Sequence, residues 1–130
     1  MMIDSSAILA IVFQEPCAER TTAAIAASAV RRMSTVNWLE TLMVVEGRHG
    51  AESADDALLI LLGLEIEPVS FDREQMLEAR AAWRRFGKGR HPAKLNLGDC
   101  CAYAAAITHA EPLLYKDDDF SQTNLPRADW

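Results

Sequence analysis

Apolar and polar residues recur along the chain with two different periods, and the changes of period predict strands and helices in turn. The first half indicates a strand over Met1 to Asp4, a helix from about Ser5, an alanine-rich helix from about Pro16 to Ala29, a strand near Arg32 to Ser34 and a helix from about Thr35 to the region of Gly47 to Gly50. On that last helix, apolar residues fall at helical spacing at Val36, Leu39, Met43 and Val44. This spacing predicts that they form the inward face, with Glu40 on it or beside it.

The second half continues the alternation. It predicts a helix over Ala51 to Leu62 with Ala54, Ala57, Leu58, Leu61 and Leu62 as its inward stripe, a strand over Ile66 to Ser70, a helix from Asp72 to about Phe86, a loop over Gly87 to Pro92, a helix capped by Asn96 and a strand over Leu113 to Lys116. Asp72 and Asn96 are residue types that cap helix N-termini through their side-chain oxygens. Strands that alternate with helices in this way predict an α/β layer fold with a central, mostly parallel sheet.

Length and composition place the chain among single-domain proteins. With 130 residues and no linker or repeat, we expect residues 1–130 to form one domain around one sizeable core. Neither a secretory leader nor an apolar run long enough to cross a membrane is present in the sequence, so the expected location is the cytoplasm, with no membrane partner. The cysteines are Cys17, Cys100 and Cys101, an odd set that argues against a disulfide framework and for a reducing compartment.

Carboxylates stand at the edges of apolar segments. Asp4 follows the first predicted strand, Asp99 lies in the first turn of a predicted helix, and Asp117 to Asp119 follow the last predicted strand. The first and last of these groups meet at one edge of the sheet if their strands are parallel neighbours, and Asp99 and Glu40 can face the same edge. Converging carboxylates repel one another and are costly to desolvate, so this pattern indicates a site for a hard divalent cation.

A run of basic residues leads into Asp99. The net charge of the chain is −6, yet no acid occurs between Arg80 and Gly98, a stretch that carries Arg80, Arg84, Arg85, Lys88, Arg90, His91 and Lys94. A solvated helix face followed by a loop is one interpretation of this run. The other is a surface that attracts nucleic acid through its phosphates, and the position beside a candidate metal site favours it.

Four stretches together resemble the PIN-domain nucleases, and among them the VapC-type toxins of bacterial toxin–antitoxin pairs. They are Ile3-Asp4-Ser5-Ser6-Ala7, Ser34-Thr35 through Leu39-Glu40, Lys88-Gly89-Arg90-His91-Pro92-Ala93-Lys94-Leu95-Asn96-Leu97-Gly98-Asp99-Cys100, and Pro112-Leu113-Leu114-Tyr115-Lys116 through Asp119-Phe120. The resemblance spans nearly the whole chain and implies the three-layer PIN fold. It also implies that Asp4, Glu40 and Asp99 bind Mg²⁺ or Mn²⁺, with Asp117 or Asp119 as a further acid and Asp119 slightly favoured.

The resemblance further implies an activity and partners. A metal-bound water would attack an RNA phosphodiester and leave a 5′-phosphate and a 3′-hydroxyl, with structured RNA such as transfer RNA as the expected substrate class. Ser6 would position the water or the phosphate, and the RNA backbone would be gathered by Arg84, Arg85, Lys88, Arg90, His91 and Lys94. The implied partner is a VapB-type antitoxin that covers the groove, and a homodimer that forms a heterotetramer or larger complex with the antitoxin is expected.

Two other functions compete with this one. A PIN-fold protein that binds RNA or a partner without cutting would share the fold but would not need the acids. Phosphatases of the haloacid-dehalogenase type resemble the chain in having an aspartate after the first strand. They require a second aspartate two residues later, where this chain has Ser6, so the phosphatase interpretation is disfavoured.

Overall fold

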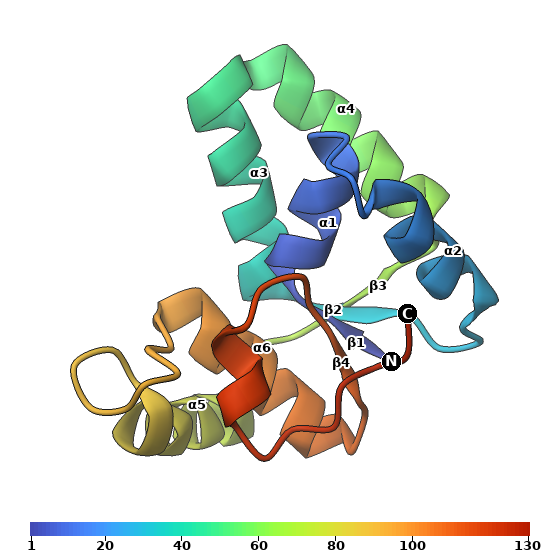
Figure 1. Ribbon diagram of the computed structural model, residues 1–130. Helices are drawn as coiled ribbons and strands as arrows, with labels where there is room; N and C mark the ends of the chain where they lie inside the picture. The colour runs from blue at the N-terminus through green and yellow to red at the C-terminus, as the bar shows by residue number, and fades with distance from the viewer.

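A four-stranded parallel sheet forms the centre of the molecule in a computed structural model that describes residues 1–130. Its strands are β1 (Met2–Ile3), β2 (Arg32–Ser34), β3 (Glu67–Val69) and β4 (Leu113–Leu114), in the order β3-β2-β1-β4. The helices are α1 (Ser5–Val12), α2 (Ala18–Ala27), α3 (Thr35–His49), α4 (Ala51–Gly63), α5 (Arg73–Phe86) and α6 (Leu97–His109), followed by the 3₁₀ turn η1 (Asp119–Gln122). Figure 1 shows α1 to α4 on one side of the sheet and α5 and α6 on the other, which confirms the predicted three-layer α/β fold.

The two faces of the sheet build two cores. Met2 and Leu113 pack with residues of α5 and α6, whereas the next residue of each strand, Ile3 and Leu114, packs with residues of α1, α2 and α4. Successive side chains of a strand point to opposite faces, so even strands of two residues contribute to both cores. These four side chains have no exposed surface, and their packing holds β1 and β4 between the two layers of helices.

The order of the strands places the ends of β1 and β4 side by side. β1 pairs with β4 in parallel, with Met2 opposite Leu113 and Ile3 opposite Leu114. The chain runs from β1 outward to β2 and β3 and later returns to the other side of β1. The gap between the carboxyl ends of β1 and β4 is therefore the point where the strand order reverses, and open α/β sheets form their ligand sites at such points.

The inward face of α3 differs from the predicted one. The buried residues of this helix are Asn37, Thr41 and Val45, whereas Leu39 and Met43 are 58% and 64% exposed. Asn37 and Thr41 can be buried because both are hydrogen-bonded, Thr41 to the carbonyl oxygen of Asn37 and Asn37 to groups described below. The apolar periodicity had assigned the wrong face to the core.

Other elements agree with the prediction except at their ends. Asp72 and Asn96 cap α5 and α6 as predicted, while α2 begins at Ala18 instead of Pro16 and the predicted stripe of α4 is narrower, because Leu62 is 57% exposed. None of the helices has the length and apolar character that crossing a membrane would require.

Two leucines of α4 offer a matched test of the packing. Leu61 is fully buried in the core on the α1 side, and Leu59 is 65% exposed on the same helix. We expect Leu61→Ala to lower the free energy of unfolding by on the order of 2–5 kcal/mol, because the substitution leaves a cavity. Leu59→Ala should change it by less than about 0.5 kcal/mol. Urea unfolding followed by circular dichroism measures both, and equal effects would contradict this assignment of the core.

Candidate metal centre

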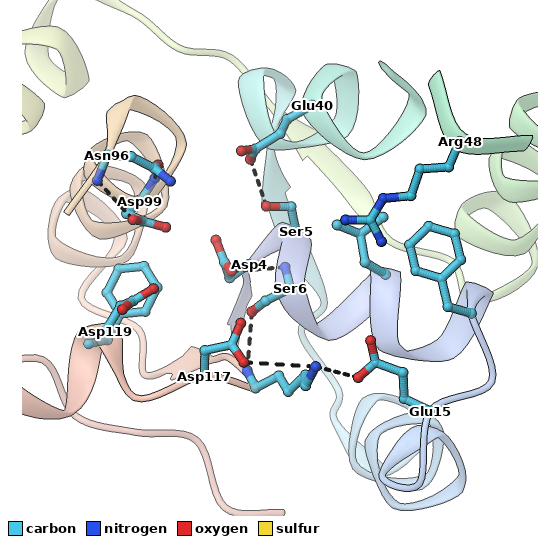
Figure 2. A pocket seen from close by; sticks show the side chains of 14 residues that line it. Asp4, Ser5, Ser6, Glu15, Glu40, Arg48, Asn96, Asp99, Asp117 and Asp119 are labelled. Atoms are coloured by element: carbon cyan, nitrogen blue, oxygen red, sulfur yellow. Dashed lines mark hydrogen bonds and ion pairs between the residues drawn. The ribbon is translucent and has the colours of Figure 1, made fainter. Parts of the chain in front are cut away.

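One cavity gathers the predicted acids at the carboxyl ends of β1 and β4. Its volume is about 250 Å³, and its lining includes Asp4, Glu40, Asp99, Asp117 and Asp119. Figure 2 shows Asp99 and Asp119 on one side of it, with Asp4 and Glu40 between them and Arg48. The prediction that residues far apart in sequence converge at this edge of the sheet is confirmed as geometry.

Asp4 is both a helix cap and a buried carboxylate. It is the N-cap of α1, where its Oδ2 accepts a hydrogen bond of 2.9 Å from the backbone N–H of Ser6. Only 3% of the residue is exposed, and Oδ1 is buried without any hydrogen-bond partner. Burial, opposed by the hydrogen bonding of Ser6 and assisted by the charges of Asp99 and Glu40, raises the pKa of Asp4 to about 7.

Asp99 is held by a reciprocal cap at the start of α6. Its Oδ2 accepts from the backbone N–H of Asn96, while the side-chain oxygen of Asn96 accepts from the backbone N–H of Asp99, both at 2.9 Å. This capping box fixes the carboxylate at the rim of the cavity. Burial raises the pKa of Asp99 to about 6, and the neighbouring carboxylates, Asp119 first among them, add to the increase.

Glu40 is oriented by residues that the sequence did not single out for this role. Its Oε2 accepts hydrogen bonds from Ser5 Oγ at 2.6 Å and from Asn37 Nδ2 at 3.1 Å. Asn37 also donates to the carbonyl oxygen of Gly98 at 3.1 Å, which ties α3 to the first turn of α6. A Cβ atom at Gly98 would come within 2.4 Å of the Glu40 carboxylate, so a side chain at this position would displace Glu40.

Two acids that follow β4, Asp117 and Asp119, also line the cavity. Ser6 Oγ accepts from the backbone N–H of Lys116 at 3.1 Å and so joins α1 to the segment that carries them. Asp117 lies 3.8 Å from Lys116 Nζ. The pKa of Asp119 is raised by burial and by Asp117 and Asp118, and Lys94 opposes the increase. Asp118, which the sequence analysis did not choose, does not line the cavity.

The donor set fits a hard divalent cation. The cavity presents several carboxylate oxygens, and one of them is buried without a partner; Mg²⁺ and Mn²⁺ favour such oxygen ligands. The five acids do not stand close enough together to form a ready-made group of three ligands, so an ion would draw their oxygens closer together. An ion would also offset the burial and the mutual repulsion that raise the pKa values of Asp4 and Asp99.

Most of the predicted basic run lies away from the cavity. None of Arg84, Arg85, Lys88, Arg90, His91 and Lys94 lines it, and only Lys94 is close enough to influence Asp119. Arg85 stacks over Phe86 and Arg90 over Trp83, with guanidinium-to-ring distances of 4.7 and 4.0 Å. Not lining the acidic cavity does not test whether these residues contact the RNA backbone, so that expectation stays a prediction.

Two basic residues that were not predicted as site residues, Arg48 and Lys116, line the cavity instead. Lys116 is ion-paired with Glu15, and Arg48 comes from the last turn of α3. The sequence carried a signal for Lys116, which directly precedes the last acidic cluster. Nothing in the local sequence distinguishes Arg48 from a solvated residue at a helix end.

Comparison with known proteins identifies the family. The PIN-domain family model matches residues 1–125. The chain is 43% identical over 125 residues to Ribonuclease VapC30 of Mycobacterium tuberculosis, covering 96% of this chain and 95% of that protein. It is 44% identical over 125 residues to Ribonuclease VapC of Mycolicibacterium smegmatis, covering 96% and 97%.

Solved structures share the fold at lower sequence identity. The crystal structure of VapC20 of Mycobacterium tuberculosis, described as a sarcin–ricin loop cleaving toxin, superposes with a TM-score of 0.78 at 19% identity and covers 95% of each chain. VapBC2 of Rickettsia felis, bound to a promoter DNA fragment, gives a TM-score of 0.74 at 15% identity and covers 98% of this chain and 96% of that one. The family match, the close relatives and the shared fold agree, and the chain belongs to the PIN-domain family, among the VapC ribonucleases.

Proposed function

We propose that this protein is a metal-dependent endoribonuclease, the toxin of a VapBC toxin–antitoxin module, in which residues 1–130 form a single PIN domain. The observation that carries the proposal is the convergence of five carboxylates on one cavity, with a buried oxygen of Asp4 left without a partner. Relatives more than 40% identical along nearly the whole chain are named ribonucleases. The cation is Mg²⁺ or Mn²⁺, because the ligands are all oxygens.

In the proposed reaction the side chains of the cavity hold the cation and orient the water or the phosphate. Asp4 and Asp99 would hold the cation with Asp119 as a third ligand, and Glu40 and Asp117 would complete the acidic pocket. When bound, the cation would lower the pKa of a water molecule and offset charge on the phosphate. Ser6 lies where it can orient the water or the phosphate. In-line hydrolysis of the RNA phosphodiester would leave a 5′-phosphate and a 3′-hydroxyl and, for a substrate such as transfer RNA, would arrest translation and growth.

The proposed partners follow from the family and the surface. Structures of similar fold include a toxin–antitoxin complex from Klebsiella pneumoniae and the VapBC2 assembly of Rickettsia felis, which supports a VapB-type antitoxin as the partner in the cytoplasm. The exposed apolar residues Leu39 and Met43 of α3 and Leu59 and Leu62 of α4 are candidate contacts for the antitoxin or for a homodimer within a larger complex. A protein that binds RNA or its partner without cutting it remains the alternative.

The first test is cleavage of total RNA by the purified, antitoxin-free protein. We expect cuts that require Mg²⁺ or Mn²⁺, disappear in EDTA and leave 5′-phosphate ends. Asp99→Asn should lower the rate by at least about 100-fold, as loss of a metal ligand does. Asp55→Asn, an exposed acid on α4, is the matched control and should cleave normally. Intact RNA in every lane, from folded protein that binds the metal, would favour the non-cutting alternative.

Gly98 gives a second test, which does not alter an acid. We expect Gly98→Ala to reduce the cleavage rate by about 10- to 100-fold, since the new methyl group would overlap the position of the Glu40 carboxylate. Gly47→Ala on α3, where nothing lies within 4 Å of the added atom, is the control and should leave the rate unchanged. Rates are compared at matched melting temperatures. Full activity of Gly98→Ala would show that the position of Glu40 is not needed.

The raised pKa values predict how stability depends on pH in EDTA. The folded Asp4 and Asp99 carboxyls titrate near about 7 and about 6, above the unfolded value of about 3.9. Between roughly pH 4 and pH 7 the folded state binds more protons, so its free energy of unfolding falls as pH rises. We expect the free energy of unfolding to fall by on the order of 1–3 kcal/mol between about pH 5 and pH 7.5.

Saturating Mg²⁺ or Mn²⁺ should remove most of that loss, because the ion takes the place of the protons. Asp4→Asn is the control variant and should show a weaker dependence on pH. Urea unfolding curves recorded across this range provide the measurement. A free energy of unfolding in EDTA that rises from pH 5 to pH 7.5 would contradict the assignment of Asp4 as a buried, unpaired carboxyl.

A further inference from the structure

Arg48 is a cation that shares the cavity with the carboxylates but stands apart from them. It lies eight residues after Glu40 on α3, about 12 Å farther along the helix axis and about a quarter of a turn around it. Both residues line the same cavity. Figure 2 shows Arg48 on the side of the cavity opposite Asp99 and Asp119, so the cavity has an acidic end and a basic end.

The guanidinium of Arg48, an exposed residue, contacts an aromatic ring and is not neutralised by an acid. It lies over the ring of Phe13, 5.1 Å from the ring centroid, and Phe13 in turn packs edge-on against His49 with ring centroids 5.4 Å apart. Arg48 forms no ion pair, whereas the other basic residue of the cavity, Lys116, is paired with Glu15. Stacking occupies one face of the guanidinium and leaves its N–H groups at the edges free to donate.

We propose that Arg48, which contacts Phe13, binds a phosphate of the RNA strand other than the one that is cleaved. This inference rests on the proposed function and names a subsite of it. A planar guanidinium donates two parallel hydrogen bonds to phosphate oxygens. The rise of about 12 Å between the backbone positions of Glu40 and Arg48 along α3 places Arg48 away from the acids, so the phosphate that it meets is a different one from the phosphate at the metal. The acidic end repels RNA, so an unpaired cation at the other end of the cavity supplies attraction where most of the basic run does not reach.

The test measures binding of RNA separately from its cleavage. In an Asp99→Asn background with Mg²⁺, fluorescence anisotropy would follow a fluorescein-labelled single-stranded RNA of mixed sequence, about ten nucleotides long, over a range of salt concentrations. We expect Arg48→Gln to weaken binding about five-fold and to reduce the slope of log K against log salt by about 0.7, the value for one lost phosphate contact on a single strand. Arg48→Lys should keep the slope, because it keeps the charge, while binding less tightly.

The matched control is Arg73→Gln, an exposed arginine in the first turn of α5 that does not line the cavity; its slope should equal that of the background protein. An unchanged slope in Arg48→Gln, or no measurable RNA binding by the background protein, would overturn the inference. It would also be overturned if Arg48→Gln impaired capture of an acidic protein partner alone. Cleavage by the parent protein is measured separately, so a failed subsite with intact cleavage is distinguishable from a failed nuclease assignment.

Discussion

The burial of the Asp4 carboxylate at the end of β1 is the constraint on which the rest of the site depends. A carboxylate taken out of water without a counter-charge is unfavourable, and other acids nearby make it more so. The structure shows both effects, since burial is the largest cause of the raised pKa values of Asp4 and Asp99 and the acids raise one another's values. Such an arrangement lowers the stability of the isolated fold near neutral pH, and a bound cation relieves it.

The short parallel strands make this burial possible. The backbone N–H of Asp4 donates to the carbonyl oxygen of Leu114 at 2.9 Å. Asp4, the first residue after β1, is therefore still hydrogen-bonded to β4. Ser6 adds a second link through its hydrogen bond with the backbone of Lys116. These bonds hold residues from the beginning and the end of the chain at the same edge of the cavity. The two cores pack against the two faces of the sheet and hold its strands in position.

The sequence predicted that the acids converge on one cavity but not which residues orient them. Asp4, Asp99 and the cluster after β4 were recognisable because each follows a local signal, such as a strand end or a cap, and these signals survive folding. The face of α3 was mispredicted because Asn37 and Thr41 are polar and yet buried. Thr41 donates within α3 to the carbonyl oxygen of Asn37, and Asn37 donates to the carbonyl oxygen of Gly98 on α6, a contact that the spacing of apolar residues does not reveal. Arg48 was missed for a related reason, since its position beside Phe13 depends on how α1 and α3 pack together.

Asp4, Asp99 and Glu40 share one pattern of hydrogen bonding. In Asp4, Asp99 and Glu40, one carboxylate oxygen accepts hydrogen bonds from the protein: Oδ2 from Ser6, Oδ2 from Asn96, and Oε2 from Ser5 and Asn37, respectively. The second oxygen of each makes no hydrogen bond within the protein. The hydrogen bonds to one oxygen restrict the rotamer of each side chain. Binding a cation would therefore cost less side-chain entropy than it would for freely rotating carboxylates. Local structure therefore uses one oxygen of each side chain and leaves the other for the proposed cation.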